Sequence, residues 1–330
     1  MTEPPRSTAE AAALWAMHMR RGAFDAAWSL NDAMRRARMV SHRADIPRHF
    51  QTIWDGEPVD GRRVLVRCYH GLGDTIQFIR YVPLLRPRVA QLLLWVQPAL
   101  LPLLSKGIAG VDAFLPLHDG DPGIPHDATM EIMELPYLFR TNLSSIPHQV
   151  PYLDVPVARL DRSHGPAIGL VWRAGDWARH RSIPFDALSP LTSAAVTWYV
   201  LQGSDGLQDR PEGFGTLAGT DDILEAARTI AALDLLITID SMPAHLAGAL
   251  GTSVWTLLPA EADWRWMEGR DDNPWYPTMR LFRQERSGEW GPVIERVAAA
   301  LGAFVEGARE ASQPTLTTRI ADGSNAARDC

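Results

Sequence analysis

The segment 235–259 constrains the fold of this chain more than any other part of the sequence. It opens on Leu235–Ile239, a continuous apolar and β-branched run that is typical of a parallel strand buried on both faces. Asp240 and Ser241 then favour a helix N-terminus, and Gly251 stands where a helix would end, before a second apolar run. The order strand, helix, strand predicts an α/β fold with a parallel sheet.

The start of this expected helix, at Ser241 and Met242, is a candidate anion site. In a parallel sheet such helix starts lie at the carboxyl edge of the strands, where their free N–H groups and positive dipole end favour phosphate. His245 lies four residues after Ser241 and projects from the same side of the helix. A purely structural histidine is the alternative. We expect a nucleotide diphosphate to bind at this helix start.

The length and composition of the chain narrow the class of protein. Its 330 residues exceed what one hydrophobic core usually fills, so two domains are expected. A net charge of −7 argues against a protein dedicated to nucleic acid, and two cysteines suit neither a disulfide framework nor a zinc site. No apolar run is long enough for a transmembrane segment, and no signal-peptide pattern opens the chain. We expect a cytoplasmic protein, either free or peripheral at the inner membrane.

The two ends of the chain differ from its middle. Residues 1–50 carry two expected helices, at about 8–21 and 24–38, and the wording of 22–33 resembles the centre of a tetratricopeptide repeat. This hairpin is expected either to cap the first domain or to dock a protein partner. Residues 306–330 are polar and without periodicity, which predicts a disordered tail.

Two α/β regions lie between these ends, at 51–155 and 156–305. In the first we expect strands at 63–68, 91–96 and 113–117, followed by a loop-rich stretch at 118–150. In the second we expect strands at 167–172, 196–201, 235–239, 254–258 and 279–282, and a closing helix at 292–305. Two such halves, joined near 151–164, predict a cleft between the carboxyl ends of two sheets, where ligands usually bind.

A second group of candidate residues follows the first strand. Gly71 and Gly73 lie in a turn that opens a helix, but Ile76 stands where a dinucleotide-binding fingerprint needs a third glycine. These glycines are therefore expected to allow close backbone approach in the cleft. Asp74, at the tip of the turn, is expected to be either a helix cap or a carboxylate general base that accepts a proton from a hydroxyl nucleophile.

Cationic and aromatic residues complete the candidate set. Arg173 and Arg181 follow the first strand of the second half, where they are suited to neutralising a leaving diphosphate; a solvated basic loop is the alternative. Trp264, Trp266 and Trp275 are expected either to stack on a base or sugar or to pack in the interior. No His/Cys/Asp/Glu spacing suggests a metal, and no Gly-x-Ser-x-Gly motif suggests a hydrolase.

Together, these motifs resemble the bacterial glycosyltransferase family 9, in particular its tetratricopeptide-linked branch, which is related to the lipopolysaccharide heptosyltransferases. The similarity covers about residues 55–304. It rests on four segments in the family's order: His-Gly-Leu-Gly-Asp-Thr-Ile-Gln-Phe at 70–78, Arg-Ser-Ile-Pro at 181–184, Asp-Ser-Met-Pro-Ala-His-Leu-Ala-Gly-Ala-Leu-Gly at 240–251, and the tryptophan-rich segment 263–277.

The resemblance implies a GT-B fold, in which two Rossmann-like domains face each other, with the acceptor in the N-terminal half and the donor in the C-terminal half. It also implies an inverting glycosyltransferase that moves a sugar from a nucleotide-diphosphate sugar to a hydroxyl of a glycan or protein, without a bound metal or another cofactor.

By the same resemblance, roles fall on matching positions. Asp74 matches the catalytic carboxylate, and Arg181 matches the basic residue that contacts the departing diphosphate. The implied donor-binding residues are Asp240, Ser241, Met242, His245, Arg173 and Trp264. The implied acceptor-side residues are Gly71, Gly73 and Gln77.

The sequence departs from the family in three places. Arg181 stands where the heptosyltransferases usually have Lys, which keeps the charge and changes its geometry. The loop 172–181 is short, and Met242 and Pro243 replace small residues. Two alternatives to the active transferase stay open: a catalytically silent relative that binds a nucleotide sugar or a partner protein, and a GT-B-fold sugar-nucleotide epimerase.

Overall fold

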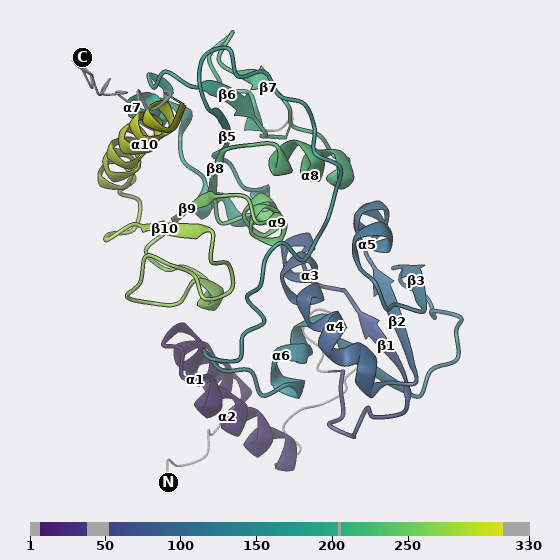
Figure 1. The fold of residues 1–330 in the computed structure, drawn as a ribbon. Coiled ribbons are helices and arrows are strands. Elements are labelled where there is room, and N and C mark those ends of the chain that lie inside the picture. Colours follow the sequence, from purple (N-terminus) through teal and green to yellow (C-terminus); the bar gives the residue numbers. More distant parts are fainter. Residues whose placement is uncertain (1–6, 38–52, 204–205, 313–330) are drawn as a thin grey trace, which may run out of the picture.

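A computed structural model of the chain describes residues 7–37, 53–203 and 206–312, which form a helical hairpin and two α/β lobes (Figure 1). The first lobe has a four-stranded parallel sheet in the order β3-β2-β1-β4. Its strands are β1 (Arg63–Arg67), β2 (Gln91–Val96), β3 (Ala113–Pro116) and β4 (Ala128–Glu131). Its helices are α3 (Leu72–Phe78), α4 (Val82–Leu85), α5 (Leu101–Gly107) and α6 (Leu135–Leu138).

The second lobe has a six-stranded parallel sheet in the order β10-β9-β8-β5-β6-β7. Its strands are β5 (Ala167–Val171), β6 (Thr197–Val200), β7 (Thr216–Leu217), β8 (Leu235–Ile239), β9 (Val254–Leu258) and β10 (Met279–Arg283). Its helices are α7 (Ser189–Thr192), α8 (Ile223–Ala231), α9 (Met242–Leu250) and α10 (Gly291–Ser312). Within the described ranges, no helix is both long enough and apolar enough to cross a membrane.

The strand–helix–strand unit predicted for 235–259 is confirmed as β8, α9 and β9. All five residues of β8 and all five of β9 are buried, as expected for central parallel strands. Gly251 ends α9 in the left-handed conformation, with φ of 74°, which glycine adopts without steric cost. Ser241 occupies the N-cap position, but its hydroxyl donates to the Ile239 carbonyl and makes no capping bond.

The structure differs from the expected limits of regular structure in two places. The loop-rich stretch 118–150 also contains β4, a strand that was not predicted and that pairs in parallel with β1 at the edge of the first sheet. The expected tail 306–330 begins too early, because α10 continues through 306–312; residues 313–330 lie outside the described residues. Polar residues in this stretch indicated disorder, but Glu306, Arg309 and Glu310 lie on the exposed side of a helix whose Val305 is buried.

The hairpin of α1 (Thr8–Arg20) and α2 (Phe24–Arg36) contacts both lobes (Figure 1). Toward the first lobe, the Trp28 indole N–H donates to the Thr141 carbonyl at 2.6 Å. Toward the second, Trp15 packs edge-on against Trp264 at 5.3 Å between ring centroids, and Arg20 pairs with Glu268 at 3.2 Å. The hairpin therefore caps the body of the protein and bridges its two lobes.

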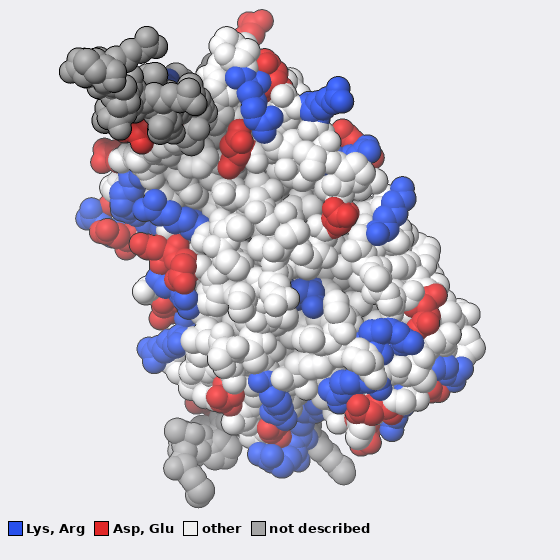
Figure 2. Space-filling model, viewed as in Figure 1, with Lys and Arg blue, Asp and Glu red and all other residues white. Residues whose placement is uncertain are grey.

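The lobes meet where α3 packs against α9, and one buried apolar cluster includes residues from both sides of this junction. The chain crosses between the lobes at Tyr152 and Leu153, whose backbone N–H groups donate to the Ala249 carbonyl at the end of α9. On the face shown in Figure 2, side chains of opposite charge are interspersed and lie mainly toward the edges.

Candidate functional site

A cleft of about 780 Å³ lies between the lobes and receives the carboxyl ends of both sheets. The first lobe contributes the turn into α3, and the second contributes the start of α9 and the loop after β5. Nine of the eleven residues predicted for the site line this cleft: Gly71, Gly73, Asp74, Arg173, Arg181, Asp240, Ser241, Met242 and His245. The sequence motifs thus converge on one place, although they are spread from residue 71 to residue 245.

Two predicted site residues do not line the cleft. Gln77 is fully buried in α3, and its side-chain amide makes no hydrogen bond to the described residues. Trp264 packs against Phe78 and Trp275, at 6.2 and 6.3 Å between ring centroids, on the side that the hairpin covers. Of the two roles left open for these tryptophans, the structure shows packing for Trp264.

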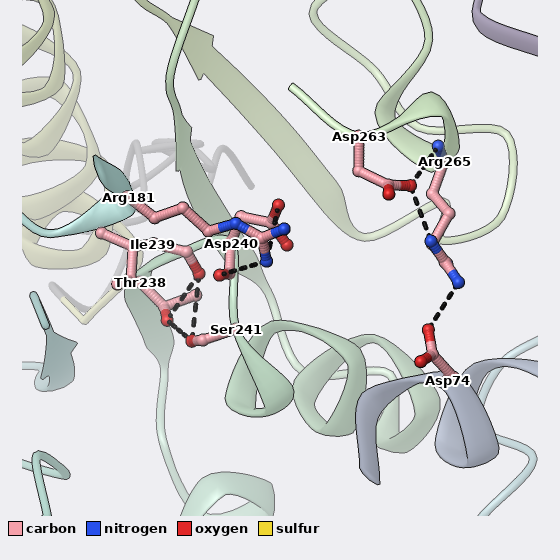
Figure 3. Close-up of polar contacts among 8 residues, drawn as sticks. All are labelled: Asp74, Arg181, Thr238, Ile239, Asp240, Ser241, Asp263 and Arg265. Carbon is pink, nitrogen blue, oxygen red and sulfur yellow. Dashed lines mark hydrogen bonds and ion pairs between the residues drawn. The ribbon is translucent and has the colours of Figure 1, made fainter. Parts of the chain in front are cut away.

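Arg181 and Asp240 form an ion pair at the start of α9 (Figure 3). Arg181 ends the segment Asp176–Arg181, two 3-10 turns separated by a kink at Ala178, and its Nη1 lies 3.2 Å from Oδ2 of Asp240. Asp240 directly follows β8, and its side chain is only 6% exposed. Burial raises the pKa of Asp240, although the Arg181 guanidinium pulls it down. The residue predicted to contact phosphate is therefore already held beside the helix start by a carboxylate.

Asp74 lies across the cleft from this pair, and both of its oxygens have partners. Oδ2 accepts a hydrogen bond from the Gly71 backbone N–H at 2.8 Å, which caps the start of α3. Oδ1 lies 2.5 Å from Nη2 of Arg265, which comes from the second lobe (Figure 3). The two roles proposed for Asp74 are thus not exclusive, because the capping carboxylate also faces the cleft.

Arg265 is a charged residue of the cleft that is not among the predicted site residues. It lies in a 3-10 turn, Trp264–Trp266, and bridges Asp74 and Asp263, the latter at 2.7 Å. Burial alone would lower the pKa of Arg265, but the carboxylates of Asp263 and Asp74 have the larger effect and raise it. They leave it cationic at any physiological pH. A sequence signal was present, since an arginine between two tryptophans beside an aspartate is unusual for a solvated face.

His245 is buried at the edge of the cleft and has a well-defined structural environment. Its ring stacks on Trp266 at 5.1 Å, and Nδ1 lies 3.0 Å from the Tyr276 hydroxyl. Burial, with the nearby Arg265 charge, lowers the pKa of His245 to about 3, so the imidazole is neutral near pH 7. A Cβ atom at Gly73 would lie 2.7 Å from its Cδ2. The glycine therefore permits the close contact between α3 and α9.

The remaining cleft cation, Arg173, extends from the carboxyl end of β5 and pairs with Asp209 at 3.5 Å. Its backbone N–H donates to the Gln202 side chain at 2.9 Å. Among the described residues, no group of three or more His, Cys, Asp or Glu side chains is arranged to hold a metal ion. The charged groups that meet in the cleft are carboxylates from both lobes and guanidiniums from the second lobe.

No protein-family model matches the sequence. Protein FlbA from Caulobacter vibrioides is 28% identical over 293 residues, which cover 76% of this chain and 48% of that protein. The chain therefore spans about half the length of the curated relative it matches.

Solved structures share its architecture. A glycosyl transferase family 9 protein from Veillonella parvula has a TM-score of 0.56 at 13% identity, over 76% of this chain and 99% of that one. The ADP-heptose lipopolysaccharide heptosyltransferase II of E. coli has a TM-score of 0.50 at 14% identity, over 74% and 99%. At these identities the likeness concerns the fold. With its two facing parallel α/β lobes, the chain has the GT-B fold of glycosyltransferase family 9, the family that its motifs resemble.

Proposed function

We propose that this protein is an inverting glycosyltransferase that moves a sugar from a nucleotide-diphosphate sugar to a hydroxyl group of a glycan or protein. The observation that carries the proposal is the position of Asp74, a carboxylate of the first lobe that faces the start of α9 and Arg181 across one cleft. A base on one side and positive charge on the other is what a displacement at a sugar carbon requires. The GT-B fold supports the proposal by analogy.

In the proposed reaction, Asp74 takes the proton of the acceptor hydroxyl as its oxygen attacks C1 of the donor sugar. The new C1–O bond forms while the bond from C1 to the diphosphate oxygen breaks, and the bonding electrons leave with the nucleotide diphosphate. Attack from the face opposite the leaving group inverts the anomeric centre. The N–H groups at the start of α9 and the Arg181 guanidinium stabilise the charge that develops on the diphosphate.

In the proposed reaction, Arg181 stabilises the leaving diphosphate while it keeps its ion pair with Asp240. A guanidinium has five N–H donors, so one face is able to hold the carboxylate while another binds phosphate. Both residues line the cleft, and the Arg181 side chain is the more exposed of the two, at 19% against 6% for Asp240. Asp240 then orients the guanidinium or binds a donor hydroxyl, since a carboxylate repels phosphate. Arg173, Ser241 and Met242 are proposed to complete the donor side, and Gly71 and Gly73 the acceptor side. We propose no resident cofactor.

The experiment is a binding screen followed by a turnover assay. Thermal shift of the full chain with a panel of nucleoside mono- and diphosphates identifies the nucleotide, because a ligand that binds the folded state raises the melting temperature. Release of that nucleotide from its sugar conjugates then measures transfer. Asp74→Asn is expected to lower release by about 10²- to 10⁴-fold, the usual contribution of a general base. Asp186→Asn, an exposed aspartate outside the cleft, is the matched control.

A second candidate function is a catalytically silent protein that binds a nucleotide sugar. One observation favours it: Asp74 and Arg181 are both ion-paired with residues of the protein itself. Binding without release, in the wild type as in Asp74→Asn, would establish this alternative. The hairpin contacts the body of the protein, and a role for its outer face in docking a protein partner stays a proposal.

A further inference from the structure

We propose that Arg265 is a positioning residue that aims the Asp74 carboxylate at the acceptor hydroxyl; this inference rests on the proposed function. The two side chains come from different lobes, and the distance from Nη2 to Oδ1 is 2.5 Å. A charge-assisted hydrogen bond of this length fixes the direction of a carboxylate. Asp74 is thus held from both sides, by Gly71 of its own helix and by Arg265 from the opposite lobe.

The environment of Arg265 makes it a rigid support. Its side chain is 9% exposed, and its guanidinium carbon lies 4.8 Å from the Trp264 ring centroid and 5.6 Å from that of Phe78. Asp263 holds the opposite end of the guanidinium at 2.7 Å and also accepts from the Arg265 backbone N–H. A charge that packs against two aromatic rings and is tethered by a carboxylate has little freedom to follow a substrate. It provides a preorganised contact for Asp74.

The position of Arg265 depends on the hairpin as well. Trp264, which precedes it, contacts Trp15 of α1, and Glu268 forms an ion pair with Arg20 of the same helix. The turn that carries Arg265 is therefore held between the hairpin and the first lobe. The direction of the proposed base is set by contacts from three parts of the chain that are far apart in sequence.

An ion pair that only stabilised the junction between the lobes would have the same geometry. Kinetic measurements distinguish this structural role from the positioning of Asp74. If Arg265 acts through Asp74, its loss costs activity only while Asp74 is present. We expect Arg265→Met to lower kcat by about a hundredfold, the cost of misplacing a catalytic group by about 1 Å. The dissociation constant for the nucleotide found in the screen is expected to change by less than about threefold, because Arg265 aims the base and binds no phosphate.

The decisive measurement is a double-mutant cycle on kcat. The variant with Asp74→Asn and Arg265→Met together is expected to be no slower than Asp74→Asn alone, within about threefold, since residues that act as a unit are not additive. Arg265→Lys is expected to recover at least about tenfold of the loss, because it restores a cation beside Oδ1. Arg270→Met is the matched control, since Arg270 pairs with Asp272 in the same segment at 2.6 Å and does not line the cleft.

The outcomes separate the two proposals. Additive losses in the double variant, or a nucleotide affinity that falls together with kcat in Arg265→Met, would overturn the role of Arg265 and leave the transferase proposal standing. A wild-type protein that releases nucleotide from no donor would overturn the proposed function, and the role of Arg265 with it.

Discussion

Gly73 is the position where a single added carbon tests how the two lobes meet. A Cβ atom there would lie 2.7 Å from Cδ2 of His245, whereas carbon atoms in contact are normally about 3.5–4.0 Å apart. The imidazole has no room to retreat, because it stacks on Trp266 and lies within hydrogen-bond distance of Tyr276. The change Gly73→Ala must therefore push α3 away from α9.

Two opposing contributions determine how much Gly73→Ala changes the free energy of unfolding. Replacing glycine by alanine inside a helix normally stabilises a protein by about 0.5–1 kcal/mol. Overfilling a buried contact costs about 1–3 kcal/mol. We expect the cost of overfilling to exceed the gain at position 73, with a net loss of up to about 2.5 kcal/mol. Gly302→Ala in α10 is the matched control, because a Cβ there meets nothing within 4 Å, and it is expected to gain up to about 1 kcal/mol.

The assay is urea unfolding of both variants and the wild type, followed by tryptophan fluorescence and far-UV circular dichroism. Two probes are needed, because a two-lobed chain does not have to unfold in a single step. Nucleotide release from the donor found in the screen is measured in parallel. It is expected to fall in Gly73→Ala, since Asp74 is the next residue and would move away from Arg265. If Gly73→Ala proved as stable and as active as Gly302→Ala, the close contact of α3 with α9 would not exist as described.

Three further predictions concern the hairpin, the first lobe and the donor side. Trp28→Phe removes the buried hydrogen bond to the Thr141 carbonyl and is expected to lower the free energy of unfolding by about 1–3 kcal/mol. The measurement is the urea midpoint, and an unchanged midpoint would contradict the contact between the hairpin and the first lobe. Burial raises the pKa of Glu131 to about 8, so the folded state holds a proton that the unfolded state releases, and stability falls as pH rises from about 4.5 to 8. Glu131→Gln should reduce that fall by at most about 1.4 kcal/mol per pH unit, while Glu134, whose pKa burial raises to about 7, keeps its own share. The measurement compares urea midpoints near pH 5.5 and 7.5. Asp240→Asn removes a negative charge beside Arg181 and is expected to tighten binding of inorganic pyrophosphate by roughly three- to tenfold in calorimetry; weaker binding would show that Asp240 supports the anion site.

The parts of the fold that the sequence predicts are those with local signals. β8, α9 and β9 follow from an uninterrupted apolar run and a glycine at the helix end, all of which act over a few residues. β4 lacks such signals. It has four residues, ends on the buried Glu131, and becomes a strand because Val64 of β1 offers a partner for Ala128. Pairing between distant segments is a tertiary effect that local propensity does not register.

The same distinction separates the predicted from the missed members of the candidate site. Asp74, Arg181 and Asp240 each follow a predicted strand, so the topology of a parallel sheet places them at the cleft. Arg265 lies within a 3-10 turn in an irregular segment, and its partner Asp74 is 191 residues away in the chain. Nothing in the sequence around Arg265 specifies that partner. It is found only when both lobes are in place.

The site is therefore a property of the junction rather than of either lobe. The first lobe alone presents Asp74 as a helix cap, and the second alone presents Arg265 tethered to Asp263. Only their approach, which Gly73 permits and the hairpin supports through Trp15 and Trp264, gives the carboxylate its second contact. Any relative rotation of the lobes would break the pair between Asp74 and Arg265 before it disturbed the pair between Arg181 and Asp240, because the latter lies within one lobe. Movements at the junction should thus act on the proposed base and spare the donor side.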